Sequence, residues 1–571
     1  MRSSPWRVLL VAGIVAGAAL RAWQIGSQVL IEDEWHAIHK LLHADALDIF
    51  THLGHSDYSI PLTLYYGWLY HHSGLSEWSM HWPSLAAAIA LLIAGPRLIA
   101  RDFSLPVRSI WVGLVAVSPL LVYHAKIARP YALTSLLTFV AIVAFRNWWR
   151  GRSRLDAAVY VASTFLAGWL HLVALTFALL PFLHYAVSAI AMFARATAQS
   201  GSGSVRERGA QLRTDIARLF GLAAVTGIAL ALVLLPPLVV DFASLSAKAA
   251  QDRVTAESLY RTWLMLAGTS HGIVAALAAI AAAWGFVRIR ARDAELAAYL
   301  ATIVAGIAVV AASGAMWISH PLVLARYSIP ALPFLLLFAA EGVVDAVERL
   351  ARPTLATFAT ASMLIGVLVT GPLPAQWHYP NQFWGHMLYQ FDYDRAHNPY
   401  ATLVPDGPVP AFYALLRQLP PRSITLVEVP WRLESQFNSQ PIYQAVHRQW
   451  IRIGLVTPVC GSVGFGEYGE DEAGMRMRQF VHLSALLRGE TAGVDYLVVH
   501  RRAAGANSPW PDVQQCLPQL ARRFGAPVYG DAQITVFGLS RAAAALDASN
   551  AVRAAPVSPH STDDTPAGAR P

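Results

Sequence analysis

Charged residues are scarce in this sequence of 571 residues, because Asp, Glu, Lys and Arg together make up only 14% of the chain. Soluble proteins contain about 25% of such residues, so the composition argues against a soluble enzyme. Hydrophobic residues make up 55% of the chain, and many apolar runs are as long as a membrane-spanning helix requires. The sequence therefore predicts a polytopic α-helical membrane protein.

Cysteine is almost absent, since the only two are Cys460 and Cys516 in the polar C-terminal part. They show no metal-ligand spacing, and they could form a disulfide if this part lies outside the cytoplasm. The sequence also has no Walker loop, no dinucleotide-binding fingerprint and no Gly-x-Ser-x-Gly nucleophile elbow. The common nucleotide-binding and hydrolase signatures are therefore missing.

Positive charge is in excess, with a net charge of +8, and its distribution predicts the orientation of the chain. With the N-terminus in the cytoplasm, the arginine-rich segments between the apolar runs all fall on the cytoplasmic side, as the positive-inside rule requires. This pattern is typical of membrane topology and not of nucleic-acid binding. The only lysines and arginines in the outer segments before residue 374 are then Lys40, Lys126, Arg129, Lys248, Arg253, Arg261 and Arg326.

About eleven apolar runs are long enough to predict membrane-spanning helices. They lie near 8–25, 82–100, 107–124, 131–149, 155–172, 173–194, 216–240, 271–287, 295–316, 322–345 and 354–373. The first run resembles a signal peptide in outline, but no clean cleavage site follows it, so we expect an uncleaved span. Ile60 to His72 is also apolar but too short to cross a bilayer, and we predict a helix in the membrane interface.

The composition changes after the last apolar run, which predicts three parts. Residues 1–373 form a transmembrane module with a first outer loop at 26–80, residues 374–545 form an extracytoplasmic α/β domain, and residues 546–571 form a disordered tail. Within the α/β domain, strand patterns lie at 423–429, 451–456, 494–499 and 533–537, and helical patterns lie at 441–449, 479–488 and 513–524.

Three acidic residues, Glu32, Asp33 and Glu34, follow the first apolar run. Ionisable groups beside a bilayer are costly to bury, so they are candidates for a functional role. A solvated acidic loop that only marks the outer side is the simpler interpretation. We predict that Asp33 and Glu34 are catalytic, with a carboxylate acting as general base.

Basic and aromatic residues of two other outer segments are predicted to lie on the same side of the membrane as these acids. Lys126 and Arg129 lie in a short turn between the third and fourth runs, whereas Arg326 and Tyr327 lie at the outer end of the tenth. Arginine suits a leaving phosphate, because its planar fork binds two oxygens and stays charged. Snorkelling of these side chains to lipid headgroups is the simpler alternative.

Histidines near these segments raise the question of a metal ion. His55 and Asp57 lie in the histidine-rich first outer loop, and His171 lies at the outer end of the fifth run. No His-Glu-x-x-His pattern supports a metal site. We predict no definite cofactor, and we leave a divalent metal or the acceptor near these three residues as an open alternative.

Several of these motifs occur in the same order in a known family. They are Arg21 followed by Asp33-Glu34, Gly74-x-Ser-Glu77 with Pro83-Ser84, Ser118-Pro119 followed by Lys126 to Tyr131, and Arg326-Tyr327 with Pro330 and Pro333. Over residues 8–345 the chain thereby resembles the membrane glycosyltransferases of the GT-C class. It is most similar to the branch that holds protein O-mannosyltransferases and lipid A aminoarabinose transferases.

The resemblance implies transfer of a sugar from a polyprenyl-phosphate carrier to a lipid, glycan or protein acceptor at the outer face of the cytoplasmic membrane, with inversion at the anomeric carbon. It further implies that Asp33 activates the acceptor hydroxyl and that Arg326, Lys126 and Arg129 hold the lipid phosphate.

The chain departs from the family at three places. Ser59-Ile60-Pro61 stands where the family often has His-Pro-Pro, His81 stands where it has Arg, and Thr134-Ser135 stand where some members have Asp. The α/β domain lies outside the resemblance.

Two other functions fit a polytopic chain. A transporter or flippase of lipid-linked sugars should show two related halves and interrupted helices at matching positions, and the sequence indicates neither. A non-catalytic assembly protein for envelope polysaccharides would use the membrane part as an anchor, which rarely needs so many spans. The sequence therefore favours a lipid-linked glycosyltransferase of a bacterial inner membrane, with an acceptor, a lipid-linked donor and the bilayer as its partners.

Overall fold

The computed structural model divides the chain into two compact units. The first, a helical bundle, holds the described residues up to 374; the second, built on a β-sheet, holds those of 409–429 and 447–540. Cys460, Cys516 and the predicted tail lie outside the described residues. The structure describes residues 4–23, 25, 34, 37–38, 41, 44–54, 58–198, 202–249, 252–269, 271–350, 352–374, 409–421, 423–429, 443, 447–455, 480–482, 493–501 and 517–540.

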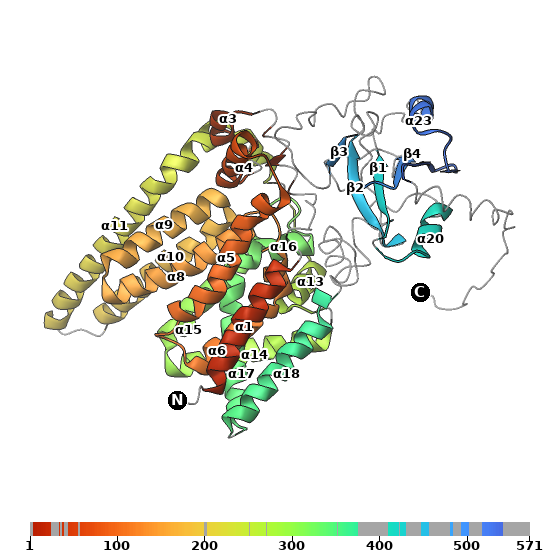
Figure 1. The fold of residues 1–571 in the computed structure, drawn as a ribbon. Coiled ribbons are helices and arrows are strands. Elements are labelled where there is room, and N and C mark those ends of the chain that lie inside the picture. Colours follow the sequence, from red (N-terminus) through yellow and green to blue (C-terminus); the bar gives the residue numbers. More distant parts are fainter. Residues whose placement is uncertain are drawn as a thin grey trace, which may run out of the picture. The chain divides into compact units, whose positions relative to one another are not determined.

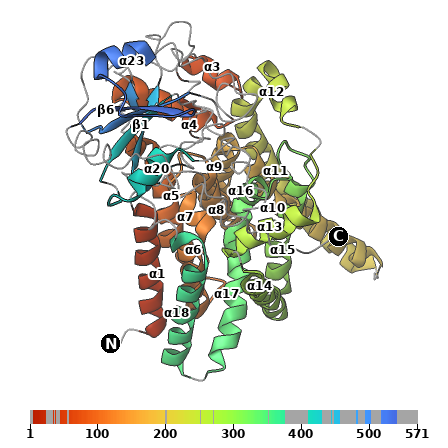
Figure 2. The ribbon, with the colours of Figure 1, turned by 90° about the vertical axis from the view of Figure 1, so that its right-hand side faces the viewer.

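The first unit consists of long helices with shorter helices near one end (Figure 1). The long helices are α1 (Pro5–Ala22), α5 (Glu77–Leu98), α6 (Leu105–Val117), α8 (Tyr131–Gly151), α9 (Arg154–Leu170), α10 (Val173–Ala198), α11 (Ser202–Val240), α14 (Gly272–Arg292), α15 (Ala294–Ala311), α17 (Leu332–Glu348) and α18 (Pro353–Thr370). The short ones are α3 (Ala46–Thr51), α4 (Ile60–His72), α7 (Pro119–Tyr123), α12 (Phe242–Ala247), α13 (Ala256–Ala267), α16 (Pro321–Ser328) and the 3-10 turn η1 (Ile329–Ala331). Figure 2 shows α3 and α4 at the end of the bundle away from the N-terminus.

Nine helical segments among the described residues are long and apolar enough to cross a membrane. Each of the predicted apolar runs is helical, and the two that fall short of a full span are α6, with 13 residues, and α9, with 17. Large apolar side chains such as Phe220, Ile273 and Phe358 are exposed, as expected where helices face lipid. The prediction of a polytopic helical membrane protein is therefore confirmed.

The third predicted run is not one continuous helix. α6 ends at Val117, Ser118 is extended, and α7 begins at Pro119. Proline lacks a backbone N–H and disfavours a helical conformation in the residue before it, which explains the break at this dipeptide. Apolar length alone did not indicate this interruption of the third run. The break leads the chain through α7 into the turn 124–130 that precedes α8.

The first outer loop is tied to neighbouring segments by its backbone and by one tyrosine. The short helix predicted at the interface is present as α4, with 13 residues. Just before it, the N–H of Gly54 donates to Oδ2 of Asp241 at 2.8 Å, and the hydroxyl of Tyr58 donates to the carbonyl of Ser244 at 2.7 Å. These bonds hold the segment before α4 against the chain that follows α11.

Two glycines allow α14 and α17 to pack closely. A Cβ atom added at Gly285 would overlap the carbonyl oxygen of Phe338, and one added at Gly342 would overlap the carbonyl oxygen of Ala281. Small residues at a helix interface let two backbones approach, which is a common device in membrane bundles. This seam joins the helix that follows α16 to the rest of the bundle.

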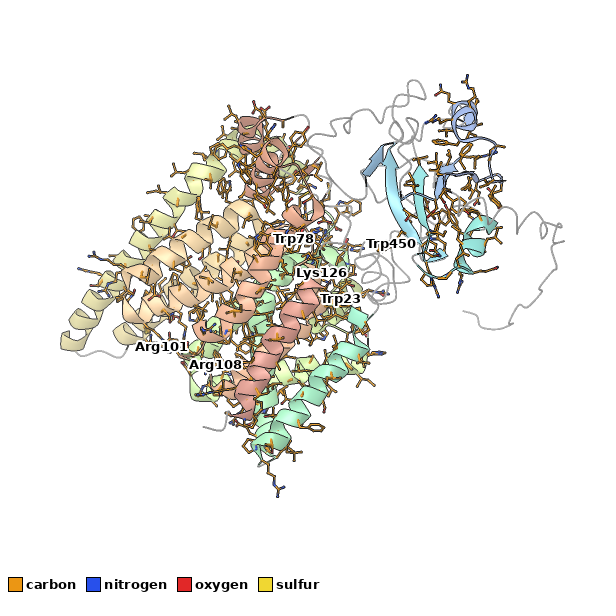
Figure 3. The ribbon with its side chains drawn as sticks, in the orientation of Figure 1. Trp23, Trp78, Arg101, Arg108, Lys126 and Trp450 are labelled. Atoms are coloured by element: carbon orange, nitrogen blue, oxygen red, sulfur yellow. The ribbon has the colours of Figure 1, made fainter. Side chains whose placement is uncertain are left out.

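Arginines of the predicted inner segments gather at one end of the bundle. Arg146 and Arg150 of α8 both form ion pairs with Asp102 and Asp293. Further ion pairs join α14 to α17, namely Arg292 with Glu341 and Arg288 with Asp345. Figure 3 shows two groups toward opposite ends of the bundle, Arg101 and Arg108 in one and Trp23, Trp78 and Lys126 in the other.

The second unit is a six-stranded sheet with the order β3-β2-β1-β4-β6-β5. Its strands are β1 (Thr425–Val429), β2 (Trp450–Leu455), β3 (Phe480–His482), β4 (Tyr496–His500), β5 (Tyr529–Gly530) and β6 (Ile534–Gly538), and its helices are α20 (Ala411–Arg417) and α23 (Leu517–Phe524). The first four strands are parallel, whereas β6 is antiparallel to both β4 and β5. The predicted α/β architecture is confirmed.

One predicted helix of this unit is wrong. Residues 480–482, which the sequence places in a helix, form β3 and pair with residues 453–455 of β2. The predicted helix at 513–524 is present as α23, and the one at 441–449 lies largely outside the described residues.

The central strand β1 carries a buried carboxylate. Oε2 of Glu428 lies 2.8 Å from Nε2 of His500 and accepts the hydroxyl of Tyr413 at 3.2 Å, and Nε2 of His447 lies 3.7 Å from Oε1. Burial alone would raise the pKa of Glu428, but contacts with His447 and His500 outweigh it and keep that pKa below its usual value. The ionised carboxylate therefore links β1 to β4 and to α20.

Candidate functional site

The turn 124–130 is the centre of the candidate site. Ala125, Lys126 and Ala128 of this turn are almost fully buried. The turn is closed by short backbone bonds, in which the N–H of Lys126 donates to Tyr123 and that of Arg129 donates to Ile127. A buried turn of this kind holds its side chains in fixed directions. Other segments of the chain contact either the turn or Tyr131, the residue that follows it.

The acidic stretch reaches the turn through Glu34. This residue is 0% exposed, and its Oε1 accepts the N–H of Ala128 at 2.5 Å and lies 2.8 Å from Nε2 of His81. The hydroxyl of Tyr66 donates to the carbonyl of the same residue, Ala128, at 2.9 Å. Glu34 and Tyr66 of α4 therefore meet at one residue of the turn, and His81 of α5 joins them through Glu34.

Tyr66 remains protonated in this position. Burial is the main reason why its pKa lies well above the ordinary value, and the negative charge of Glu34 adds to the effect. The hydroxyl therefore acts as a permanent hydrogen-bond donor to the turn.

The tenth run contributes Arg326 and Tyr327 of α16. The guanidinium of Arg326 lies over the ring of Tyr131, 5.7 Å from the ring centre. The Tyr131 ring contacts the rings of His124 and His171, with centres 4.8 and 5.6 Å away, and the His171 ring lies 5.3 Å from that of Tyr327. Four rings from four segments therefore form a continuous row beside Arg326.

The three cations differ in their exposure. Arg129 and Arg326 are half-buried, whereas Lys126 is only 1% exposed. Burial, followed by the positive charge of Arg21, lowers the pKa of Lys126 to about 7. Its amine is therefore close to its titration point at neutral pH, and a bound anion would favour the protonated form.

The structure brings together those predicted site residues that it describes. Glu34 and Arg326 contact the turn or Tyr131, Lys126 and Arg129 belong to the turn, and His171 and Tyr327 belong to the row of rings. The other three, Asp33, His55 and Asp57, lie outside the described residues.

Sequence reasoning missed His81 and Tyr66 as members of the site. His81 binds Glu34 from 47 positions away, and Tyr66 binds Ala128 from 62 positions away. The only local signal was a polar group inside an apolar segment. Such a signal marks a residue as unusual but does not name its partner.

Within the described ranges, no group of three or more His, Cys, Asp or Glu side chains is placed to hold a metal ion. His171 packs against the rings of Tyr131 and Tyr327. The site thus combines two accessible cations, one buried amine and a bound carboxylate, an arrangement suited to an anion beside an acidic loop.

The fold and these contacts define a multi-pass membrane protein with a cationic, aromatic site at one end of its bundle. Among solved structures, the chain is similar to the crystal structure of ArnT from Cupriavidus metallidurans in the apo state, with 13% identity, a TM-score of 0.42 and coverage of 94% of this chain and 98% of that chain. The structure of ArnT bound to undecaprenyl phosphate matches with 12% identity and the same TM-score and coverage. No protein-family model and no curated protein matches the chain. We therefore base the proposed function on the residues and contacts of this chain.

Proposed function

We propose that the protein is a GT-C type membrane glycosyltransferase that takes a sugar from a polyprenyl-phosphate donor. One observation carries the proposal: residues 124–131 contact both Glu34, the sequence neighbour of Asp33, and Arg326. A displacement at the sugar carbon requires a base and phosphate-binding cations in fixed relative geometry, and the contacts of Glu34 and Arg326 with this one segment support that arrangement.

In the proposed reaction, the carboxylate of Asp33 takes the proton of the acceptor hydroxyl as that oxygen attacks the anomeric carbon. The bond from the anomeric carbon to the lipid phosphate breaks as the new bond forms, and the phosphate leaves with the bonding electrons. Attack opposite the leaving group inverts the anomeric centre. We give Glu34 a positioning role, because its buried carboxylate already binds Ala128 and His81.

The three cations would contribute to binding of the lipid phosphate in different ways. Arg129 and Arg326 are the two that a phosphate can reach, because both are half-buried and not fully enclosed. The ring of Tyr131 lies against the guanidinium of Arg326, and Tyr327 belongs to the same row of rings. The buried amine of Lys126, within the turn, would take up a proton when the phosphate binds and would then add positive charge.

We further propose that the site faces the periplasm of a bacterium with the protein in its inner membrane. The arginine ion pairs at the other end of the bundle suit the cytoplasmic side under the positive-inside rule. A lipid phosphate presents its sugar at the membrane surface, where the half-buried arginines would meet it. The sugar is a hexose or pentose in this proposal, and the acceptor is a lipid, glycan or protein.

Substitution of Asp33 tests the proposed base. We expect Asp33→Asn to lower transfer of a labelled sugar from polyprenyl phosphate by about 100-fold or more, because the amide cannot take the proton. The purified variant should keep the thermal unfolding midpoint of the parent. Full transfer activity in the variant would remove Asp33 from this role.

Substitution of Arg326 tests the proposed donor site. We expect Arg326→Ala to raise the KM for the donor by about tenfold or more while the KM for the acceptor stays the same. Arg349→Ala is a matched control, because Arg349 is 72% exposed at the other end of the bundle and forms a surface ion pair with Asp345. An unchanged donor KM in Arg326→Ala would contradict the assignment.

A further inference from the structure

The break between α6 and α7 leaves backbone carbonyls without their usual helical partners. In a continuous helix the N–H of residue 119 would donate to the carbonyl of Val115, but Pro119 has no N–H. Val115 and Ala116 also lie in the last turn of α6, whose carbonyls receive no bond from within that helix. These buried oxygens need donors from elsewhere.

Arg21, at the end of α1, supplies those donors. Its Nη2 donates to the carbonyl of Val115 at 2.8 Å, and its Nη1 donates to Ala116 at 3.2 Å and to Gly17 at 2.9 Å. α1 can approach this closely because Gly17 has no side chain, and a Cβ there would lie 2.8 Å from that of Ala116. The planar guanidinium therefore spans both helices.

The guanidinium of Arg21 is unusual in its surroundings. It is 1% exposed, and within the described part of the chain its hydrogen-bond partners are these three carbonyls alone. Its Nε has no partner there, and the residue borders a small cavity with His124 and Ser135, with room for about one water molecule. A buried charge is costly, so a neutral donor would be a less expensive way to satisfy carbonyls.

We propose that Arg21 is a positioning residue that holds the interrupted helix α6–α7 and thereby fixes the turn 124–130. This inference rests on the proposed function, because it assigns Arg21 a task in donor binding without contact with the donor. The charge of Arg21 also acts on Lys126, whose pKa is lowered first by burial and then by Arg21, so that it limits the pH range in which the protonated amine can bind an anion.

Two substitutions separate the two tasks of Arg21. Arg21→Gln removes the charge, and Arg21→Lys keeps it; both lose the fork that spans Val115 and Ala116. The double variant Arg21→Gln with Pro119→Ala returns an N–H to position 119, which can donate to Val115 again. Each is studied as the full-length protein in detergent.

Amide hydrogen exchange tests the positioning task without any donor. We expect Arg21→Gln and Arg21→Lys to speed exchange in peptides covering 118–131 by about tenfold or more, because the turn loses its support. Peptides from α17 should exchange at the parental rate, and Pro119→Ala should partly restore protection. Unchanged exchange in 118–131 would overturn the positioning role, even if the protein proves to be a glycosyltransferase.

The pH dependence of donor binding tests the charge. Parental affinity for a polyprenyl-phosphate sugar should fall as pH rises through about 7. In Arg21→Gln this midpoint should move to higher pH, because Lys126 holds its proton longer, and in Arg21→Lys it should stay. A purely structural role would leave the midpoint in place in both variants and would overturn the electrostatic part. If no variant, parent included, binds or transfers the donor, the proposed function fails, and altered exchange alone would still support the positioning role.

Discussion

At the scale of single residues, Lys126 shows how burial turns an ordinary side chain into a titrating group. The amine is almost fully enclosed in the turn between α7 and α8, and burial with the charge of Arg21 brings its pKa to about 7. An exposed lysine has a pKa of about 10.4, so it would stay charged at every physiological pH. The site therefore changes charge in the range where the enzyme would work.

The lowered pKa of Lys126 predicts opposite pH dependences for the free energy of unfolding and for donor affinity. The unfolded chain binds more protons than the folded chain between pH 7 and about 10.4, so the free energy of unfolding should rise with pH in that window. Donor affinity should fall over the same range, because Lys126 loses the charge that favours phosphate. Lys126→Arg should flatten both curves, since arginine stays charged. The checks are thermal unfolding and donor binding between pH 6 and pH 9, and parallel trends in the two would contradict the assignment.

Tyr131 offers a second test at this scale. Its ring supports Arg326 and separates His124 from His171. A cation over an aromatic face gains about 0.5–2 kcal/mol, so Tyr131→Leu should raise the donor KM by roughly two- to thirtyfold. Tyr131→Phe keeps the ring and serves as the matched control, with donor KM close to the parental value. Equal effects of the two substitutions would mean that the hydroxyl matters and not the ring.

At the scale of helices and strands, apolar length predicted the bundle well because a bilayer imposes it. Every run long enough to cross was found as helix, and Ile60 to His72 was found as the separate helix α4. The interruption at Ser118-Pro119 was missed, although proline is its cause, because apolar length alone does not separate a kinked helix from a broken one.

Strand β3 shows the limit of local pattern in the second unit. Apolar residues in 479–488 recur at helical spacing, yet 480–482 pair with β2. That pairing depends on a neighbouring strand far away in sequence, which no local window contains. The same reason hid the contact between Glu34 and His81, whereas the acids and arginines themselves stood out because the chain has so few charges.

At this scale, the close packing of α14 against α17 predicts how a substitution at their interface changes stability. Gly285→Ala should lower the thermal unfolding midpoint clearly, because its Cβ would overlap the carbonyl of Phe338 and force the helices apart, at a cost of about 1–3 kcal/mol. Gly366→Ala on α18 is the control, because a Cβ there meets no atom within 4 Å and alanine favours helix. Detergent-solubilised protein followed by fluorescence and size exclusion gives both midpoints. A loss in Gly366→Ala as large as that in Gly285→Ala would rule out close packing as the cause.

At the scale of the whole bundle, charge and aromatic residues define two different ends. Arginines form ion pairs at one end, where Arg146 of α8 pairs with Asp293 and arginines of α14 pair with acidic residues of α17. Exposed tryptophans such as Trp23, Trp78 and Trp82 and the helix α4 mark the other, where the candidate site lies. Indole side chains favour the boundary between lipid and water, and arginines favour the cytoplasmic loops. The arginines therefore favour a cytoplasmic location for their end of the bundle, and the tryptophans mark a boundary between lipid and water at the other.

Chemical labelling of single introduced cysteines tests this orientation directly. Leu47 in α3 is 69% exposed near the site, and Arg349 is 72% exposed at the arginine-rich end. In a background with Cys460→Ser and Cys516→Ser, we expect Leu47→Cys to react with a membrane-impermeant maleimide in intact spheroplasts. Arg349→Cys should react only after the membrane is permeabilised, because the proposed orientation places its segment in the cytoplasm. Labelling in the reverse order would place the site beside cytoplasmic nucleotide sugars, and the case for a lipid-phosphate donor would then lose its physical basis.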